Sequence, residues 1–287
     1  MSTTGLMDPV PGVEPTKGGL YLWRFLPNLG AAVLFLLLFL GSFLYLSWKM
    51  WRTKAWFCTV FLIGCFLEVV GYGVRAGARN HTGKVMPYVV QNMFLLVAPI
   101  LFAASIYMVL GRIITSVNGA GHTPIKPSKI TMTFVLGDVF SFVVQGGGAG
   151  LSVVQKPGLA QWAERIIIIG LCIQIAMFGL FCVLSVIFHR RIRASPTTKS
   201  ASSASPWESG LHMLYGVSLL IMIRSIFRVI EYVQGQTGYA LSHEWTLYIF
   251  DSLPMFVVTV LFAWRFPSRF RTKDQDAQSC TEINLGV

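Results

Sequence analysis

The stretch "LLIMIRSIFRVIEYV", residues Leu219 to Val233, has the apolar composition of a membrane-spanning helix but contains three charged residues. A hydrocarbon core about 30 Å thick needs roughly 20 mostly apolar residues per helix. A charge near the centre of such a helix costs roughly 2.5–3.5 kcal/mol, whereas each leucine, isoleucine, valine or phenylalanine contributes only about 0.3–0.6 kcal/mol favourably. Arg224, Arg228 and Glu231 therefore need partners inside a helix bundle.

The composition of the whole chain is that of a polytopic membrane protein. Of its 287 residues, 54% are hydrophobic and 12% are charged, and the mean hydropathy is +0.63. Soluble domains carry roughly 25% charged residues. The net charge of +11 is distributed in short clusters between apolar runs, which is typical of loops beside anionic lipid. We therefore expect membrane lipids rather than nucleic acid as the surroundings of these charges.

Seven apolar segments are long enough to cross a bilayer, which predicts an all-α protein with seven transmembrane helices in one bundle. In the fourth segment, "QGGGAG" is a poor helix interior. We expect an extracellular N-terminal segment at 1–27, a transmembrane domain at 28–265 and a cytoplasmic tail at 266–287. The predicted spans are 28–48, 55–76, 88–110, 129–152, 163–188, 211–233 and 244–265.

Lysine and arginine are distributed unequally between the two sets of loops. The loops after the first, third and fifth spans, together with the C-terminal tail, hold 14 of these residues, and the opposite side holds six. Cytoplasmic loops carry the excess of positive charge. The N-terminus is therefore predicted to lie outside and the C-terminus in the cytosol. The sequon Asn80-His81-Thr82 then lies outside, which makes Asn80 a candidate for glycosylation.

Polar residues recur at helical spacing in four of the spans, so that each set shares one helix face. Such faces turn toward the bundle interior. Most of these residues belong to the outer half of the bilayer, which indicates a polar cavity open toward the outer leaflet. Ion pairs that only lock the helices together remain the alternative. The candidate ligand-binding residues are Glu68, Arg75, Gln91, Asp138, Gln145, Arg224, Arg228, Glu231, Glu244, Tyr248 and Asp251.

The sequence carries no pattern typical of a cofactor site or a metal site. No Walker A or other phosphate-binding loop is present, and the five histidines do not have metal-ligand spacing. The five cysteines show no C-x-x-C motif. "VLGD" and "YIFD" superficially resemble aspartyl protease motifs, but the second glycine and the order are missing. We therefore expect no enzyme, no cofactor and no bound metal ion.

Five segments, covering the second to the seventh span in order, are similar to the fungal lipid-translocating exporter family. This is the seven-span group that resembles "resistance to aminocholesterol" proteins. All the candidate residues lie within the matching segments, and except for Tyr248 they are the positions that the resemblance carries over as the family's motif. The segments are "EVVGYGVRAGAR" (68–79), "QNMFLLVAPILFAASIYMVLGRII" (91–114), "GDVFSFVVQGGGAG" (137–150), "IRSIFRVIEYVQG" (223–235) and "HEWTLYIFDSLPM" (243–255).

The resemblance implies a fungal multi-pass protein with its N-terminus outside. It also implies movement of sphingoid long-chain bases or sterol-like compounds, resistance to toxic amphiphiles and, in one branch, porphyrin uptake. The expected partner is thus a lipid or another amphipathic small molecule. We expect the plasma membrane, with vacuolar or endosomal membranes as alternatives.

The alternative function is a seven-helix lipid receptor or sensor. The number of helices and the outside N-terminus agree with it. The third span, however, ends in "LGRIITSV", without the acidic–arginine pair typical of common receptors, and "DSLPMF" in the seventh only loosely resembles their proline motif.

The predicted orientation is tested with protease cleavage sites and tags at the two ends of the chain. Protease added to intact cells should remove an N-terminal tag and leave a C-terminal tag intact, because the loops on the C-terminal side carry most of the positive charge. Immunoblots before and after permeabilisation provide the measurement and its control. Removal of the C-terminal tag from intact cells would refute the orientation.

Overall fold

The computed structural model describes residues 12–16, 21, 23, 25–79, 82–124, 126–152, 159–197, 207–235, 238–239 and 243–266. Within these ranges the regular structure is entirely helical, which confirms the predicted fold class. Short turns of 3-10 helix, η2 and η3, precede α2 and α4, and α8, η4 and α9 follow one another directly. The helices are α1 (Leu29–Thr53), η2 (Trp56–Cys58), α2 (Thr59–Ala78), α3 (Val85–Ser116), η3 (Ala120–His122), α4 (Pro127–Ser152), α5 (Leu159–Ala194), α6 (Trp207–Val233), α8 (Glu244–Leu247), η4 (Tyr248–Ser252) and α9 (Leu253–Trp264).

Seven stretches of helix are long and apolar enough to cross a membrane, the seventh being α8, η4 and α9 together. They correspond one by one to the seven predicted spans. The main differences are α3 and α5, which extend beyond the predicted 88–110 and 163–188. The chain is therefore a multi-pass integral membrane protein. The placement of its ends outside or inside stays a prediction.

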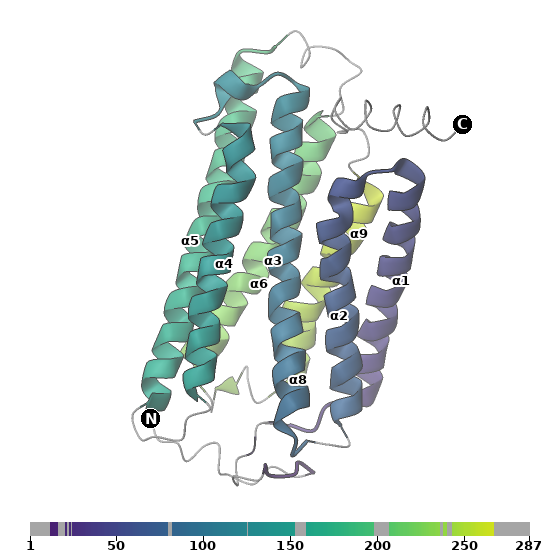
Figure 1. Ribbon diagram of the computed structural model, residues 1–287, viewed down its shortest axis with the longest axis vertical. Coiled ribbons are helices and arrows are strands. Elements are labelled where there is room, and N and C mark those ends of the chain that lie inside the picture. The colour runs from purple at the N-terminus through teal and green to yellow at the C-terminus, as the bar shows by residue number, and fades with distance from the viewer. Residues whose placement is uncertain are drawn as a thin grey trace, which may run out of the picture.

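The helices form one elongated bundle with α3 and α6 in the middle (Figure 1). The pair α4 and α5 flanks this centre on one side, and α1, α2 and α9 flank it on the other. Glycines allow α2 to lie close to α3. A Cβ added at Gly64 would lie 2.8 Å from Phe102, and one at Gly71 would lie 2.9 Å from Leu95. Such close approach through small residues is typical of membrane helices.

The glycine-rich end of α4 stays helical through Ser152 because it packs against α5. A Cβ at Gly148 would lie 2.7 Å from Ile167 and 2.9 Å from the carbonyl oxygen of Ala163. Gly170 of α5 approaches α4 in the same way. Tertiary packing thus outweighs the poor helix propensity of this segment.

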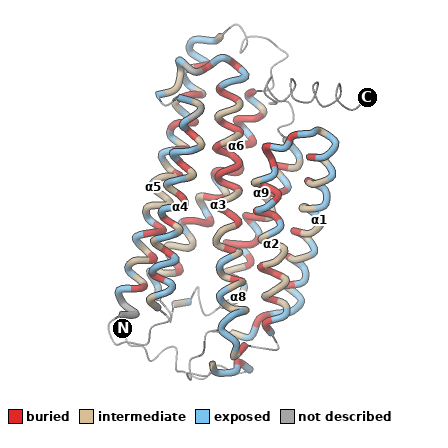
Figure 2. Tube along the Cα trace, viewed as in Figure 1, coloured by how far each residue is buried: buried red, intermediate tan, exposed pale blue. Residues whose placement is uncertain are grey.

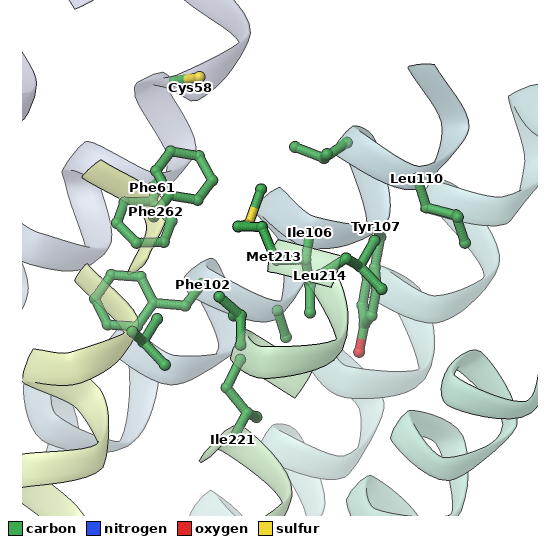
Figure 3. Packing of buried hydrophobic residues seen from close by; sticks show 14 of the residues in the cluster. Cys58, Phe61, Phe102, Ile106, Tyr107, Leu110, Met213, Leu214, Ile221 and Phe262 are labelled. Carbon is green, nitrogen blue, oxygen red and sulfur yellow. The ribbon is translucent and has the colours of Figure 1, made fainter. Parts of the chain in front are cut away.

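Burial concentrates where the helices meet, and the outward faces are apolar and exposed (Figure 2). At the end of the bundle where α2 begins and α9 ends, aromatic rings fill the interior. The rings of Phe61 and Phe262 stack with centroids 3.9 Å apart, and Phe102 lies 4.5 Å from Phe61. Figure 3 shows these rings on one side of the apolar cluster and Tyr107 on the other. By the predicted orientation this apolar half is the cytoplasmic half.

A bulky side chain at Gly148 should destabilise the bundle. Leucine at this position has no space against α5, and overpacking of this kind costs about 1–3 kcal/mol. Gly148→Leu should lower the apparent melting temperature of the purified protein in detergent. Gly146→Leu is the matched control, because a Cβ at Gly146 meets nothing within 4 Å. Equal stability of the two variants would contradict the packing described for α4.

Candidate functional site

Arg224 of α6 lies at the centre of the polar interior. Its Nε is 2.5 Å from Oδ1 of Asp251 in η4, and its Nη2 donates a hydrogen bond of 2.8 Å to the carbonyl oxygen of Leu95 in α3. Arg224 and Asp251 are each 4% exposed. One side chain therefore connects three of the spans.

Two prolines explain why these partners are available to Arg224. Pro99 follows Leu95 by four residues and has no N–H, so the carbonyl of Leu95 lacks its usual helical donor. Pro254 likewise removes the donor for the carbonyl four residues before it, and the helix widens there into the π-turn η4. Asp251 lies in this turn, where it meets Arg224.

Glu68 of α2 is buried beside this pair. Its carboxyl group is an electrostatic neighbour of both Arg224 and Asp251, yet it has no ion-pair partner within 4 Å among the described residues. One turn further along α2, Tyr72 is hydrogen-bonded through its hydroxyl to Ser252 of η4. The polar face of α2 that holds Glu68 and Tyr72 therefore lies against the π-turn. Glu68 is the carboxylate on this face that forms no ion pair with a described arginine.

A second cluster joins α2 to the start of the seventh span. Nη2 of Arg75 is 2.7 Å from Oε1 of Glu244, and Nε of Arg75 donates to the Tyr248 hydroxyl at 3.2 Å. That hydroxyl donates in turn to Glu244 at 2.9 Å. The backbone N–H of Asn28, which caps α1, donates to both carboxylate oxygens of Glu244. This cluster ties together three spans at the end of the bundle predicted to lie outside.

The segment before α1 covers this cluster. The Trp23 ring lies 5.6 Å from the guanidinium carbon of Arg75 and 5.4 Å from the ring of Tyr88 in α3. Trp23 is 3% exposed, and its Nε1 has no hydrogen-bond partner. Further along the segment, Arg79 of the loop after α2 donates to the carbonyl oxygen of Pro27. The described residues before α1 are thus part of the packed structure.

Arg228 and Glu231 form a third cluster on α6. Nη1 of Arg228 is 2.7 Å from Oε2 of Glu231. The pair faces α3, because both residues are electrostatic neighbours of Tyr88. Gln91 lies on the same face of α3, between Tyr88 and Leu95, and is 1% exposed. Nε of Arg228 and Oε1 of Gln91 are buried without a hydrogen bond.

The polar residues of α4 lie elsewhere. Asp138 accepts a hydrogen bond of 2.8 Å from the hydroxyl of Tyr107 in α3, and Gln145 donates one of 3.0 Å to Gln174 in α5. Among the described residues, no hydrogen bond or ion pair connects Asp138 or Gln145 with the clusters on α2, α6 and the seventh span. Three of the four polar faces therefore meet, and the fourth turns to α5 and to the other side of α3.

The structure buries nine of the eleven candidate side chains and leaves Arg228 and Glu244 half-buried. Nine of the eleven belong to the clusters of the three arginines. Asn80 lies outside the described residues. Spacing within single helices could not reveal the partners that come from other helices. The one sequence signal for such a partner was Pro99, which leaves the carbonyl of Leu95 without a helical donor. In the described part of the chain no three histidine, cysteine or carboxylate side chains could hold a metal ion. The partners that the spacing missed are Trp23, Asn28, Tyr72, Leu95, Tyr107 and Ser252.

Comparisons with known proteins give a consistent result. The family model "RTA1 like protein" matches residues 61–274. The chain is 38% identical to "Protein RTA1" of Saccharomyces cerevisiae, covering 92% of this chain and 90% of that protein. It is 36% identical to "Protoporphyrin uptake protein 1" of the same yeast (71% and 66% covered) and 26% identical to its "Sphingoid long-chain base transporter RSB1" (71% and 62%). No solved structure matches. The chain belongs to the RTA1-like family.

Proposed function

We propose that this protein transports lipids or other amphipathic molecules across a membrane and binds their polar head group between α3 and α6. Relatives named as a sphingoid long-chain base transporter, a lipid-translocating exporter-like protein and a protoporphyrin uptake protein support transport of this class of molecule. The observation that carries the head-group site is that three buried polar atoms of these clusters have no hydrogen bond within the described residues: Nε1 of Trp23, Oε1 of Gln91 and Nε of Arg228.

The unpaired atoms define what the head group must offer. Arg228 and Trp23 have free donors and therefore need acceptors, while the amide oxygen of Gln91 needs a donor. An amine with neighbouring hydroxyl groups, as in a sphingoid base, supplies both kinds of group. Buried polar atoms left without partners cost about 1–3 kcal/mol each, so a ligand that pairs them gains affinity and specificity.

The charges of the three clusters favour a cationic or hydroxylated head group. Arg75, Arg224 and Arg228 are matched by Glu244, Asp251 and Glu231, respectively. Glu68 is the further carboxylate next to the Arg224 pair. In the proposed transporter, Glu68 therefore attracts the ammonium group of a long-chain base, and the arginines bind hydroxyl or anionic oxygens.

The predicted orientation places the head-group site toward the outer leaflet. The cavity then opens on that side when Trp23 moves away from Arg75 and Tyr88, and the apolar tail extends between helices into lipid. We propose the plasma membrane as the location, with a vacuolar or endosomal membrane as the alternative.

The function is tested with the purified protein in liposomes that contain a fluorescent long-chain base. Movement of the label between leaflets, measured with a membrane-impermeant quencher, should be faster than in protein-free liposomes. Saturable binding without movement would favour the lipid receptor or sensor instead. Neither binding nor movement, with this base or with a porphyrin, would refute the proposal.

Substitutions at the Arg224–Asp251 pair separate ligand binding from helix locking. Asp251→Asn leaves a buried charge uncompensated, which costs about 3–5 kcal/mol, so it should lower both transport and melting temperature. The double variant Arg224→Met with Asp251→Leu removes both charges, and replacement of buried pairs by apolar residues is often neutral for stability. We expect its melting temperature to recover and its transport to stay absent. Recovery of transport together with stability would show that the pair only locks the helices.

A conservative substitution tests the role of Arg228. Arg228→Lys retains the charge beside Glu231 but removes Nε and the planar fork of donors. We expect ligand affinity to fall about tenfold, which corresponds to loss of a charge-assisted hydrogen bond of about 1.4 kcal/mol, with little change in melting temperature. Arg193→Lys is the matched control, because Arg193 pairs with Glu208 on the exposed surface. Binding is measured by crosslinking to a photoreactive long-chain base. Unchanged affinity would show that Nε of Arg228 does not bind the ligand.

A further inference from the structure

Asp138 differs from the other buried carboxylates of the chain. It is 1% exposed, its Oδ2 accepts the hydrogen bond from Tyr107, and its Oδ1 is buried without any partner. The nearby hydroxyl of Ser141 does not help, because it donates to the backbone carbonyl oxygen of Asp138 itself. One carboxylate oxygen is therefore left open in the interior of a membrane protein.

In the described part of the chain, no positively charged side chain is a neighbour of Asp138. The titratable groups that face the Asp138–Tyr107 pair are Tyr107 itself in α3 and Cys182 in α5. The ion pairs among the described residues do not include Asp138. Glu231, Glu244 and Asp251 each contact an arginine, and Glu68 has Arg224 nearby. Asp138 thus differs from the carboxylates of the proposed head-group site in two ways. It lies in a different part of the bundle, and no described arginine lies beside it.

An isolated ionised carboxylate at this depth carries a large desolvation penalty that a single hydroxyl donor does not offset. Neutralisation must come from a proton or from a bound cation. The interior here is closely packed. Tyr107 and Phe181 have ring centroids 4.5 Å apart and are fully buried, and a Cβ at Gly137 would lie 2.4 Å from Met177. A proton needs no additional space, whereas an amine head group does.

We propose that Asp138 is a proton-binding site that couples transport to the proton gradient across the membrane. This proposal rests on the proposed transport function. In each cycle one proton from water adds to Oδ1 of the carboxylate and later returns to water, while the Tyr107 hydroxyl continues to donate to Oδ2. On loading, an O–H bond of a hydronium ion breaks as the bond between the proton and Oδ1 forms, and release reverses this exchange. Loading and release change the charge between α3, α4 and α5 by one unit, which favours different packing of these helices in the two states.

The proton site is tested first without any transported lipid. Infrared difference spectra of the purified protein, recorded between acid and alkaline pH, should contain the carbonyl stretch of a protonated carboxyl group, shifted by deuterium exchange. Asp138→Asn should lose this band. Glu208→Gln also converts a carboxylate to an amide, but at the exposed Arg193–Glu208 pair, and should retain the band. Tyr107→Phe should shift the band, because the carboxyl loses its donor. An identical band in wild type and Asp138→Asn would refute the proton site.

Coupling is then tested in liposomes with an imposed pH gradient. In the wild type, the gradient should change the rate of movement of the fluorescent long-chain base several-fold, whereas Asp138→Asn should move the base at the same rate with and without the gradient. Glu208→Gln should behave as the wild type.

The outcomes of the liposome experiment separate the two proposals. A wild type that moves the base with no response to the gradient refutes the coupling and leaves the transport function intact. A response that persists in Asp138→Asn also refutes it. No movement of any amphiphile in the wild type refutes the transport function and the coupling with it, while the infrared experiment still decides whether Asp138 binds a proton.

Discussion

The contact of Arg224 with Leu95 and Asp251 is the interaction on which the interior of this bundle depends. A buried guanidinium group needs both a countercharge and hydrogen-bond acceptors. Asp251 supplies the charge, and the carbonyl of Leu95 is an acceptor because Pro99 leaves it without a helical donor. A side chain of α6 thereby satisfies a freed backbone carbonyl in α3 and a buried carboxylate in η4. The two prolines and Arg224 are therefore one structural unit. Loss of Arg224 would leave the Leu95 carbonyl and the Asp251 carboxylate buried without this partner.

The three arginine pairs do not all have the same role. The Arg75–Glu244 pair connects α2 with α8, and the Arg224 pair connects α6 with η4, so both hold helices together. Arg228 and Glu231 lie on the same helix, so their ion pair joins no second helix, although both have Tyr88 of α3 as an electrostatic neighbour. Because the ion pair itself bears the desolvation cost of burial without joining two helices, it is the pair that agrees best with the proposed role in ligand binding. Helix locking therefore accounts for the Arg75 and Arg224 pairs, whereas the Arg228 pair needs a different explanation.

Much of the fold could be predicted from the sequence, because hydrophobic length and helical spacing are properties of single segments. The seven spans and the inward-facing stripes around Glu68, Arg224 and Asp251 follow from them. The spacing of polar residues shows that they share one helix face. It does not show which neighbouring helix this face contacts, because that depends on tertiary packing. Asp138 therefore lies against Tyr107 instead of the arginines. The glycines at 148 and 170 allow the close α4–α5 contact that turns the α4 stripe away.

The distribution of polar and aromatic side chains along the bundle constrains how a ligand can cross it. At the end predicted to face outside, the proposed head-group site is covered by Trp23, which contacts Arg75 and Tyr88 through ring interactions of modest strength. Toward the other end, the stacked rings of Phe61 and Phe262, together with the ring of Phe102, fill the interior between α2, α3 and α9. Exchange with the outer leaflet thus needs a small displacement, whereas passage to the inner side requires the aromatic stack to separate. In the proposed transporter, that step is where the proposed proton coupling would act. Tyr107 lies little more than one turn beyond Phe102 on α3, so a change at the Asp138 carboxyl reaches the same helix directly.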